Sequence, residues 1–132
     1  MSDNPSAREA RNDTIVRSFL AEFETRDAAR LAPYLTDDVT FESYGDAPIQ
    51  GREALVSLWA GVFQNFAQVR FETLNQAVAG DVVIAEQVHG LALEGGVLAP
   101  IRNLAVYELR DSKIAAWRDY TNPTFAAQLL RE

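Results

Sequence analysis

The chain contains few side chains that can move protons or act as nucleophiles near neutral pH. His89 is its single histidine, Lys113 is its single lysine, and cysteine is absent. The lack of thiols excludes disulfides, thiolate nucleophiles and thiolate metal sites, and one histidine excludes a multi-histidine metal site. Lys113 follows Asp111-Ser112 in a turn-like segment, a poor place to desolvate an amine for Schiff-base chemistry. Any catalysis therefore depends on carboxylates, the imidazole and guanidinium groups, and we expect no metal and no cofactor.

The alternation of side chains along predicted strands brings one of each of these groups together. If Gly95-Gly96 and Asp111-Ser112 are two-residue hairpin loops, His89 lies opposite Arg102 and Leu104 lies opposite Asp119. A single sheet face then carries His89, Arg102, Asp119, Gln87 and Trp117, among Leu91, Leu98, Leu104 and Val106. Ionisable groups that converge among apolar side chains are typical of a small-molecule site.

Each of the three ionisable groups has a chemical interpretation and a structural one. Asp119 beside a guanidinium stays ionised and could act as a general base. His89 has an ordinary pKa near neutrality and could carry a proton, and Arg102 could stabilise an oxyanion or orient Asp119. Alternatively, His89 is a hydrogen-bonded core residue and Arg102 with Asp119 is a structural ion pair.

The elements that must position these residues follow from hydrophobic periodicity. Helical spacing predicts a helix from about Ile15 to Phe23, a short one after a cap at Asp27, and a long one over 51–66. Period-two segments predict strands at 38–44, 68–79, 82–93, 97–110 and 113–121, and Asn122-Pro123 opens a closing helix. This order predicts an α+β fold with helices on one face of a strongly bent antiparallel sheet.

Length and charge restrict the class of protein. The 132 residues suit one domain, expected over 13–132 after a flexible tail at 1–12, and the net charge is −7. The acidic balance argues against nucleic-acid binding, and no segment is apolar enough for a signal peptide or a membrane span. We therefore expect a cytoplasmic protein that binds neither nucleic acid nor membranes.

Several short motifs resemble the nuclear transport factor 2-like superfamily. They are Phe19-Leu20-Ala21, Asp37-Asp38-Val39, Gly51-Arg52-Glu53-Ala54-Leu55 and Ala116-Trp117-Arg118-Asp119-Tyr120. The chain most resembles the SnoaL-like polyketide cyclase and limonene-epoxide hydrolase branch. The resemblance implies a cone-shaped, strongly bent sheet wrapped around helices and makes Asp119 the catalytic aspartate. The resemblance also implies a homodimer, as is usual in the family. Val82, Ile84 and Val88 are apolar and lie on the opposite face of their strand, which predicts that the dimer forms through the outer sheet face.

Other positions depart from the patterns of these relatives. Gln87 and His89 stand where the epoxide hydrolases have an arginine and an aspartate, and Phe41 and Ser43 stand near their water-holding tyrosine and asparagine. Ketosteroid isomerase chemistry is rejected, because its three catalytic positions correspond to Ser43, Phe19 and Arg102.

The residues and the resemblance together predict an acid/base enzyme for a hydrophobic, oxygenated small molecule. The reaction would be epoxide hydrolysis, cyclisation, isomerisation or dehydration, with Asp119, His89 and Arg102 as catalytic residues. The substrate-binding residues would be Gln87, Ser43, Phe19, Phe41, Trp59, Phe63 and Trp117. The alternative is a non-catalytic module that binds a small ligand or a protein. A third interpretation is a site that has kept only a structural role, with Asp119 paired to Arg102 or Arg118 and no cavity beside it.

Overall fold

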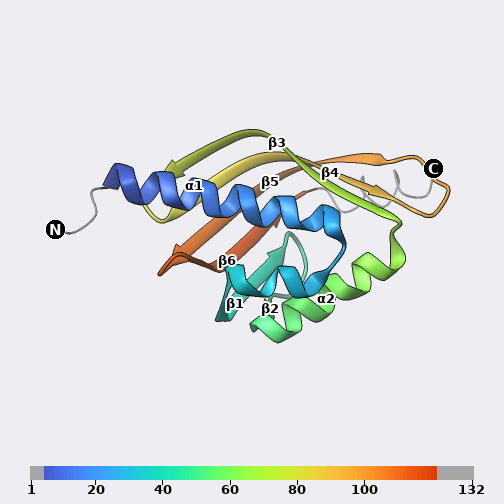
Figure 1. Ribbon diagram of the computed structural model, residues 1–132, viewed down its shortest axis with the longest axis horizontal. Helices are drawn as coiled ribbons and strands as arrows, with labels where there is room; N and C mark the ends of the chain where they lie inside the picture. The colour runs from blue at the N-terminus through green and yellow to red at the C-terminus, as the bar shows by residue number, and fades with distance from the viewer. Residues whose placement is uncertain (1–4, 122–132) are drawn as a thin grey trace.

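The computed structural model describes residues 5–121 as helices on one side of a curved sheet (Figure 1). Its elements are α1 (Pro5–Ala21), the short 3₁₀ segments η1 (Glu22–Thr25), η2 (Ala28–Arg30) and η3 (Ala32–Tyr34), β1 (Leu35–Ser43), β2 (Ile49–Gln50), α2 (Arg52–Asn65), β3 (Gln68–Ala79), β4 (Val82–Ala92), β5 (Ala99–Arg110) and β6 (Lys113–Tyr120). The expected closing helix at Asn122 lies outside the described residues.

The sheet has the strand order β2-β1-β6-β5-β4-β3, and its pairs are antiparallel except for β1 with β6. Helix α1 runs along the long strands β3 to β5, whereas α2 covers the part formed by β1 and β2 (Figure 1). The expected α+β fold with a strongly bent sheet is therefore confirmed. No helix of the described residues is long and apolar enough to cross a membrane.

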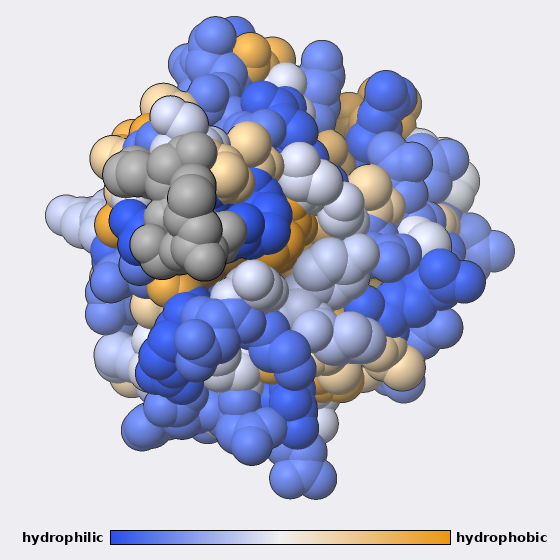
Figure 2. Space-filling model, turned by 60° about the vertical axis from the view of Figure 1, so that its left-hand side comes forward, coloured by the Kyte–Doolittle hydropathy of each residue, from blue (hydrophilic) through white to orange (hydrophobic). Residues whose placement is uncertain are grey.

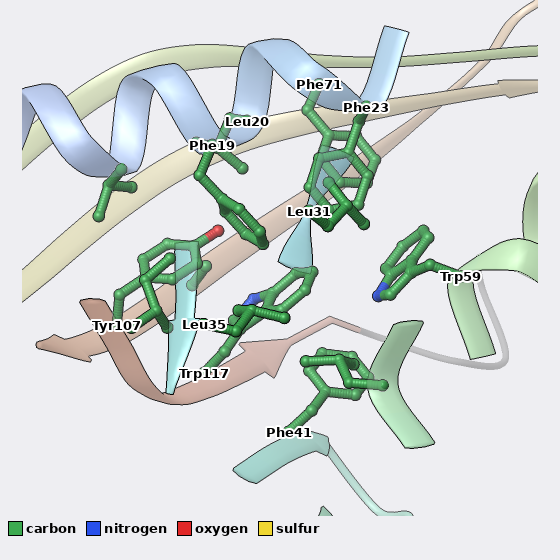
Figure 3. Packing of buried hydrophobic residues seen from close by; sticks show 14 of the residues in the cluster. Phe19, Leu20, Phe23, Leu31, Leu35, Phe41, Trp59, Phe71, Tyr107 and Trp117 are labelled. Carbon is green, nitrogen blue, oxygen red and sulfur yellow. The ribbon is translucent and has the colours of Figure 1, made fainter. Parts of the chain in front are cut away.

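Aromatic side chains fill the space between the helices and the sheet (Figure 3). Phe23, at the end of α1, stacks on Phe71 of β3 with ring centroids 4.5 Å apart and meets Trp59 of α2 edge-on at 4.8 Å. Trp59 in turn stacks parallel to Trp117 of β6 at 5.7 Å. Burial of such large rings is a main source of stability for a domain of this size. The side of the molecule in Figure 2 is mostly hydrophilic, with hydrophobic residues in small separate spots.

The helix at the N-terminal end begins earlier than the sequence indicated. Residues 5–12 were expected to belong to a flexible tail, but α1 starts at Pro5. Polar contacts with the β3–β4 turn hold this first part: Gly80 N–H donates to Glu9 at 2.9 Å, and Asn12 donates to the Gly80 carbonyl at 3.0 Å. Polar contacts rather than a periodic apolar face hold the first residues of α1 against the sheet. A prediction from hydrophobic periodicity therefore could not detect them.

The three hairpin turns of the long strands differ in how well the sequence predicted them. Gly80-Asp81 and Asp111-Ser112 form the expected two-residue loops, pairing Ala79 with Val82 and Arg110 with Lys113. The third turn is displaced, because Gly96 N–H donates to the Leu93 carbonyl at 2.9 Å and the connection spans residues 93–98. Its expected loop at Gly95-Gly96 is therefore wrong.

This displacement changes the pairing of β4 with β5 by one residue. His89 lies opposite Ile101, and Arg102 lies opposite Val88. A second irregularity in β6, near Ala115, moves Asp119 from its expected partner Leu104 to Ala105. A shift of one residue moves the side chains of a strand to the opposite face of the sheet relative to its neighbour. The shift between β4 and β5 therefore inverts β5, and the shift between β5 and β6 returns β6 to the face expected relative to β4. Strands β4 and β6 therefore present the expected faces to the core, and β5 presents the opposite one.

Candidate functional site

Asp119, on β6, is a carboxylate with only 7% of its surface exposed. Its Oδ1 accepts hydrogen bonds from Trp117 Nε1 at 2.7 Å and from Asn103 Nδ2 at 3.1 Å. Burial raises the pKa of Asp119 to about 6, although these two hydrogen bonds oppose the shift. Within residues 5–121 no hydrogen bond reaches Oδ2, so this oxygen is available to accept a proton.

His89, on β4, lies flat against Phe71 of β3 with ring centroids 3.9 Å apart and an interplanar angle of 16°. Its Nε2 is 2.7 Å from Gln87 Oε1 and 3.2 Å from Asn103 Nδ2. Burial lowers the pKa of His89 to about 4, because the charged imidazolium would lose its hydration beside an aromatic ring. The imidazole is therefore neutral at pH 7.

Asn103, on β5, lies between the carboxylate and the imidazole. Its Nδ2 lies within hydrogen-bond distance of both Asp119 Oδ1 and His89 Nε2, and its Oδ1 is buried with no partner in the described part of the chain. Gln87 continues the network, since its Nε2 donates to the Tyr107 hydroxyl at 3.1 Å. We call these five side chains the polar network: Asp119, Asn103, His89, Gln87 and Tyr107. A network of buried, hydrogen-bonded polar groups is rigid and costly to disturb.

The structure brings together most of the residues expected on this face. Asp119, His89, Gln87 and Trp117 converge as the strand alternation predicted. The placement of Arg102 in this group is wrong. Its side chain is exposed on the outer face, opposite Val88, because the shifted register turns the even-numbered side chains of β5 away from the core. Leu104 and Val106 share that error, and Leu104 is exposed.

Two members of the polar network, Asn103 and Tyr107, were not found from the sequence. Their side chains point inward from β5, whereas the expected register placed them on the outer face of the sheet. A signal for the right parity was present, because Arg102, Glu108 and Arg110 alternate on one face of this strand and charged side chains favour the solvent side. The charges of β5 thus indicated its faces better than the position of the Gly-Gly pair did.

A cavity of about 260 Å³ lies between β1 and α2. Its walls include Phe41, Ser43 and Trp59, and Ser43 is paired in register with Asp119 on the neighbouring strand. The remaining lining residues are Asp46, Ala47, Ile49, Leu58 and Val62. The indole Nε1 of Trp59 is buried and has no acceptor within the described residues.

The other expected wall residues lie elsewhere. Phe19 is fully buried in the core, edge-on to Trp117 at 5.5 Å. Phe63 faces a separate surface hollow of about 360 Å³ beside Arg26 and Gln64. Of the residues expected to bind substrate, Phe41, Ser43 and Trp59 therefore line this cavity. Gln87 belongs to the polar network, and Trp117 donates to it at Asp119. In the part of the chain that the structure describes, no group of three histidine or acidic residues is placed to hold a metal ion.

Comparisons with known proteins agree with this architecture. Residues 16–117 match the family described as SnoaL-like domain. An LEH-like epoxide hydrolase from M. tuberculosis superposes with a TM-score of 0.82 at 21% sequence identity, over 93% of this chain and 91% of the other. A Jannaschia sp. CCS1 protein described as a SnoaL-like polyketide cyclase gives 0.80 at 17% identity, over 98% and 96%. An NTF2-like protein of unknown function from Burkholderia pseudomallei K96243 gives 0.81 at 15% identity, over 92% and 98%.

Proposed function

The chain belongs to the SnoaL-like domain family, within the nuclear transport factor 2-like superfamily, and from this premise we propose that it is a cofactor-independent acid/base enzyme. Its substrate would be a hydrophobic, oxygenated small molecule. The observation that carries the proposal is the buried Asp119, which has a pKa of about 6 and an Oδ2 to which no residue in 5–121 donates. Carboxylates with a perturbed pKa recur in active sites, and Asp119 is paired in register with Ser43, which lines the apolar cavity.

Asp119 is suited to reversible proton transfer. With a pKa of about 6 it is mostly ionised at pH 7, yet its conjugate acid is strong enough to return the proton. In epoxide hydrolysis, the carboxylate would take a proton from water while the water oxygen bonds to carbon and the carbon–oxygen bond of the ring breaks. The carboxyl would then give this proton to the ring oxygen, so that a diol is released and the carboxylate is restored. In isomerisation or cyclisation, the same carboxyl would remove a proton at one atom and deliver it to another. His89, neutral at this pH, would accept a hydrogen bond from substrate or water.

The cavity supports a substrate that is largely apolar. Phe41, Trp59 and Leu58 give it aromatic and aliphatic walls, and Ser43 places a hydroxyl-bearing residue beside Asp119 in the sheet register. Its volume of about 260 Å³ lies slightly below the range typical of drug-sized ligands. A small molecule, or the apolar part of a larger one, therefore fits best.

A non-catalytic ligand-binding module is the second candidate. It draws support from the polar network itself, in which Asp119 Oδ1 and His89 Nε2 are already engaged by neighbouring side chains. Relatives of the same fold include a protein of unknown function, so the fold alone does not decide between the two. In this case the cavity would bind a ligand without turnover.

A screen of epoxides and polyketide-like ketones against the wild type and Asp119→Asn tests the proposal. We expect the variant to lose at least about 100-fold in kcat, because an amide cannot take up the proton. Asp111→Asn, in an exposed turn, is the matched control and should keep full activity. Turnover that survives Asp119→Asn undiminished would remove the central assignment, and saturable binding without turnover would favour the second candidate.

We also propose that the protein forms a homodimer through the outer face of the sheet. Three large side chains, Ile84 at 42%, Leu104 at 44% and Tyr120 at 43%, are exposed there on adjacent strands. They join the partly buried Val82 and Val88 of β4. Neighbouring exposed apolar side chains on a sheet face are a typical protein–protein contact.

A further inference from the structure

The hydrogen bonds around Asp119 have a direction that one side chain fixes. Trp117 Nε1 carries a hydrogen and has no acceptor, so Asp119 Oδ1, 2.7 Å away, must accept. Asn103 places an amide atom 3.1 Å from the same oxygen. If the amide oxygen of Asn103 faced it, two acceptors would meet with no hydrogen between them. Asn103 therefore presents its NH₂ group to Asp119.

The orientation of Asn103 restricts that of Gln87. The same Nδ2 lies 3.5 Å from the amide atom of Gln87 assigned as Oε1, and this amide atom lies 2.7 Å from His89 Nε2. If the Gln87 amide were reversed, its NH₂ group and that of Asn103 would both point at His89 Nε2, which has at most one lone pair. A buried N–H group would then lack a partner, which is unfavourable. Gln87 therefore turns its oxygen to the imidazole.

We infer that Gln87 is a positioning residue that holds His89 as the Nε2–H tautomer and leaves Nδ1 as the acceptor nitrogen. A distance of 2.7 Å between Gln87 Oε1 and His89 Nε2 is an ordinary hydrogen bond if Nε2 carries the hydrogen, and a repulsive contact if it does not. The Tyr107 hydroxyl, which either donates or accepts, holds the far end of the Gln87 amide at 3.1 Å.

The catalytic meaning of this arrangement rests on the proposed function. The Nε2–H tautomer leaves the lone pair of Nδ1 uncommitted, and no hydrogen bond to Nδ1 is formed within residues 5–121. Asp119 Oδ2 likewise accepts no hydrogen bond from residues 5–121, whereas the third such acceptor of the polar network, Asn103 Oδ1, is fully buried. The reacting molecule would thus meet two acceptors, one of them a carboxylate that takes the proton and the other an imidazole that orients the donor.

Nuclear magnetic resonance of the ¹⁵N-labelled protein without added histidines tests the tautomer directly. The chain has a single histidine, so long-range ¹H–¹⁵N correlations report His89 alone. At pH 7 we expect a protonated Nε2 and an unprotonated Nδ1. A ring in the Nδ1–H form, or one that is doubly protonated, would overturn the inference whatever the protein catalyses.

Variants of Gln87 test its role as the cause. In Gln87→Leu the acceptor is lost and the Asn103 NH₂ group, at 3.2 Å, becomes the neighbour of Nε2, so we expect a switch to the Nδ1–H tautomer. Gln87→Glu keeps an acceptor and should retain the hydrogen on Nε2. Gln87→Met provides a second apolar variant if Gln87→Leu does not give a dispersed amide spectrum. Gln68→Leu, at an exposed position, is the matched control. Retention of the Nε2–H form in a folded Gln87→Leu or Gln87→Met protein would refute the role of Gln87.

A kinetic measurement separates this inference from the proposed function. With a substrate found by the screen, Gln87→Leu should lower kcat at least about tenfold with a smaller change in KM. If Asp119→Asn abolishes turnover but the tautomer does not respond to Gln87, the inference fails and the proposed function stands. If no substrate is found but the tautomer switches in the Gln87 variants, the inference about Gln87 stands and the proposed function fails.

Discussion

Asn103 donates a hydrogen bond of 3.1 Å to Asp119 across the β5–β6 pair. The partner of the buried carboxylate is therefore a neutral amide, where the expected register had placed the guanidinium of Arg102. A neutral donor stabilises the carboxylate less than a cation would, so the desolvation caused by burial dominates and the pKa of Asp119 is raised. This relationship makes Asp119 a group that exchanges protons near neutrality rather than a permanently ionised member of an ion pair.

Asn103→Leu should impair a reaction that needs ionised Asp119. Loss of the amide donor raises the pKa of Asp119 further, because the hydrogen bond favours the charged form. The acid limb of the kcat/KM profile should move to higher pH, and activity at pH 6 should fall roughly 7- to 80-fold if the hydrogen bond contributes about 1.5–3 kcal/mol. Asn75→Leu, which removes only an exposed amide that donates to Glu86 at 2.8 Å, should leave the profile in place. An unmoved acid limb in Asn103→Leu would show that this amide does not tune Asp119.

The stability of the protein should depend on pH through two opposing groups. The pKa of Asp119 is about 6 in the folded protein against an ordinary value of 3.8, so the native state holds a proton that the unfolded chain releases. Stability from this group therefore falls as the pH rises from about 4 to 6, by roughly 3 kcal/mol in total. The pKa of His89 is about 4 against 6.5, so here the unfolded chain holds the extra proton and stability rises with pH over that window. The two slopes should nearly cancel between pH 4 and 6.

Single substitutions should expose each slope. Relative to the wild type, Asp119→Asn should become progressively more stable from pH 4 to 6, and His89→Gln progressively less stable over the same range. Urea unfolding at several pH values measures both, and the differences from wild type cancel the contributions of other carboxylates. Asp111→Asn, in its exposed turn, should follow the wild-type curve. Parallel curves for all four proteins would mean that Asp119 and His89 have ordinary pKa values when folded.

The faces of β4 and β6 could be predicted from the sequence because side chains alternate strictly along a strand. That alternation alone grouped His89 and Gln87 on one strand and Trp117 and Asp119 on another. The pairing of β5 with β4 and β6 could not be obtained in this way, because it depended on a turn and a bulge, although the alternating charges of β5 indicate its outward face. The turn closes at Leu93 and Gly96, and the side chain of Leu98 packs so closely over Gly90 that an added Cβ would come within 2.8 Å of it. Such a contact is tertiary and leaves no local pattern.

Arg102→Gln tests the corrected register. Because this side chain is exposed on the outer face and does not contact the polar network, the substitution should change the free energy of unfolding by less than about 0.5 kcal/mol and leave turnover unchanged. Asn103→Leu, one residue further, is the matched comparison at an inward position. A large loss of activity in Arg102→Gln would favour the original pairing of Arg102 with His89.

The start of α1 should depend on Asn12, which is buried although it is polar. Its side chain donates to the Gly80 carbonyl at 3.0 Å and lies 3.4 Å from Asp81 Oδ1, so it joins the helix to the β3–β4 turn. Asn12→Ala should cost about 1–3 kcal/mol of stability, because the turn carbonyl loses its partner. Hydrogen exchange should also become faster in the first turns of α1 than in β5. Asn65→Ala, at the exposed end of α2, should change neither measurement appreciably.

Ile84→Glu should separate the proposed dimer into monomers. Ile84 lies opposite Val106 on the outer sheet face, two residues along β5 from Leu104, which in turn lies opposite Tyr120. A carboxylate at position 84, among these apolar side chains, would have to lose its hydration when two copies associate, which strongly opposes dimer formation. Sedimentation velocity of the wild type should give a dimer, Ile84→Glu a monomer, and Leu93→Glu, which changes an exposed leucine in the β4–β5 connection, a dimer. A wild-type protein that is monomeric at high micromolar concentration would refute the proposed interface, and equal dissociation in both variants would show that the outer sheet face is not the specific contact.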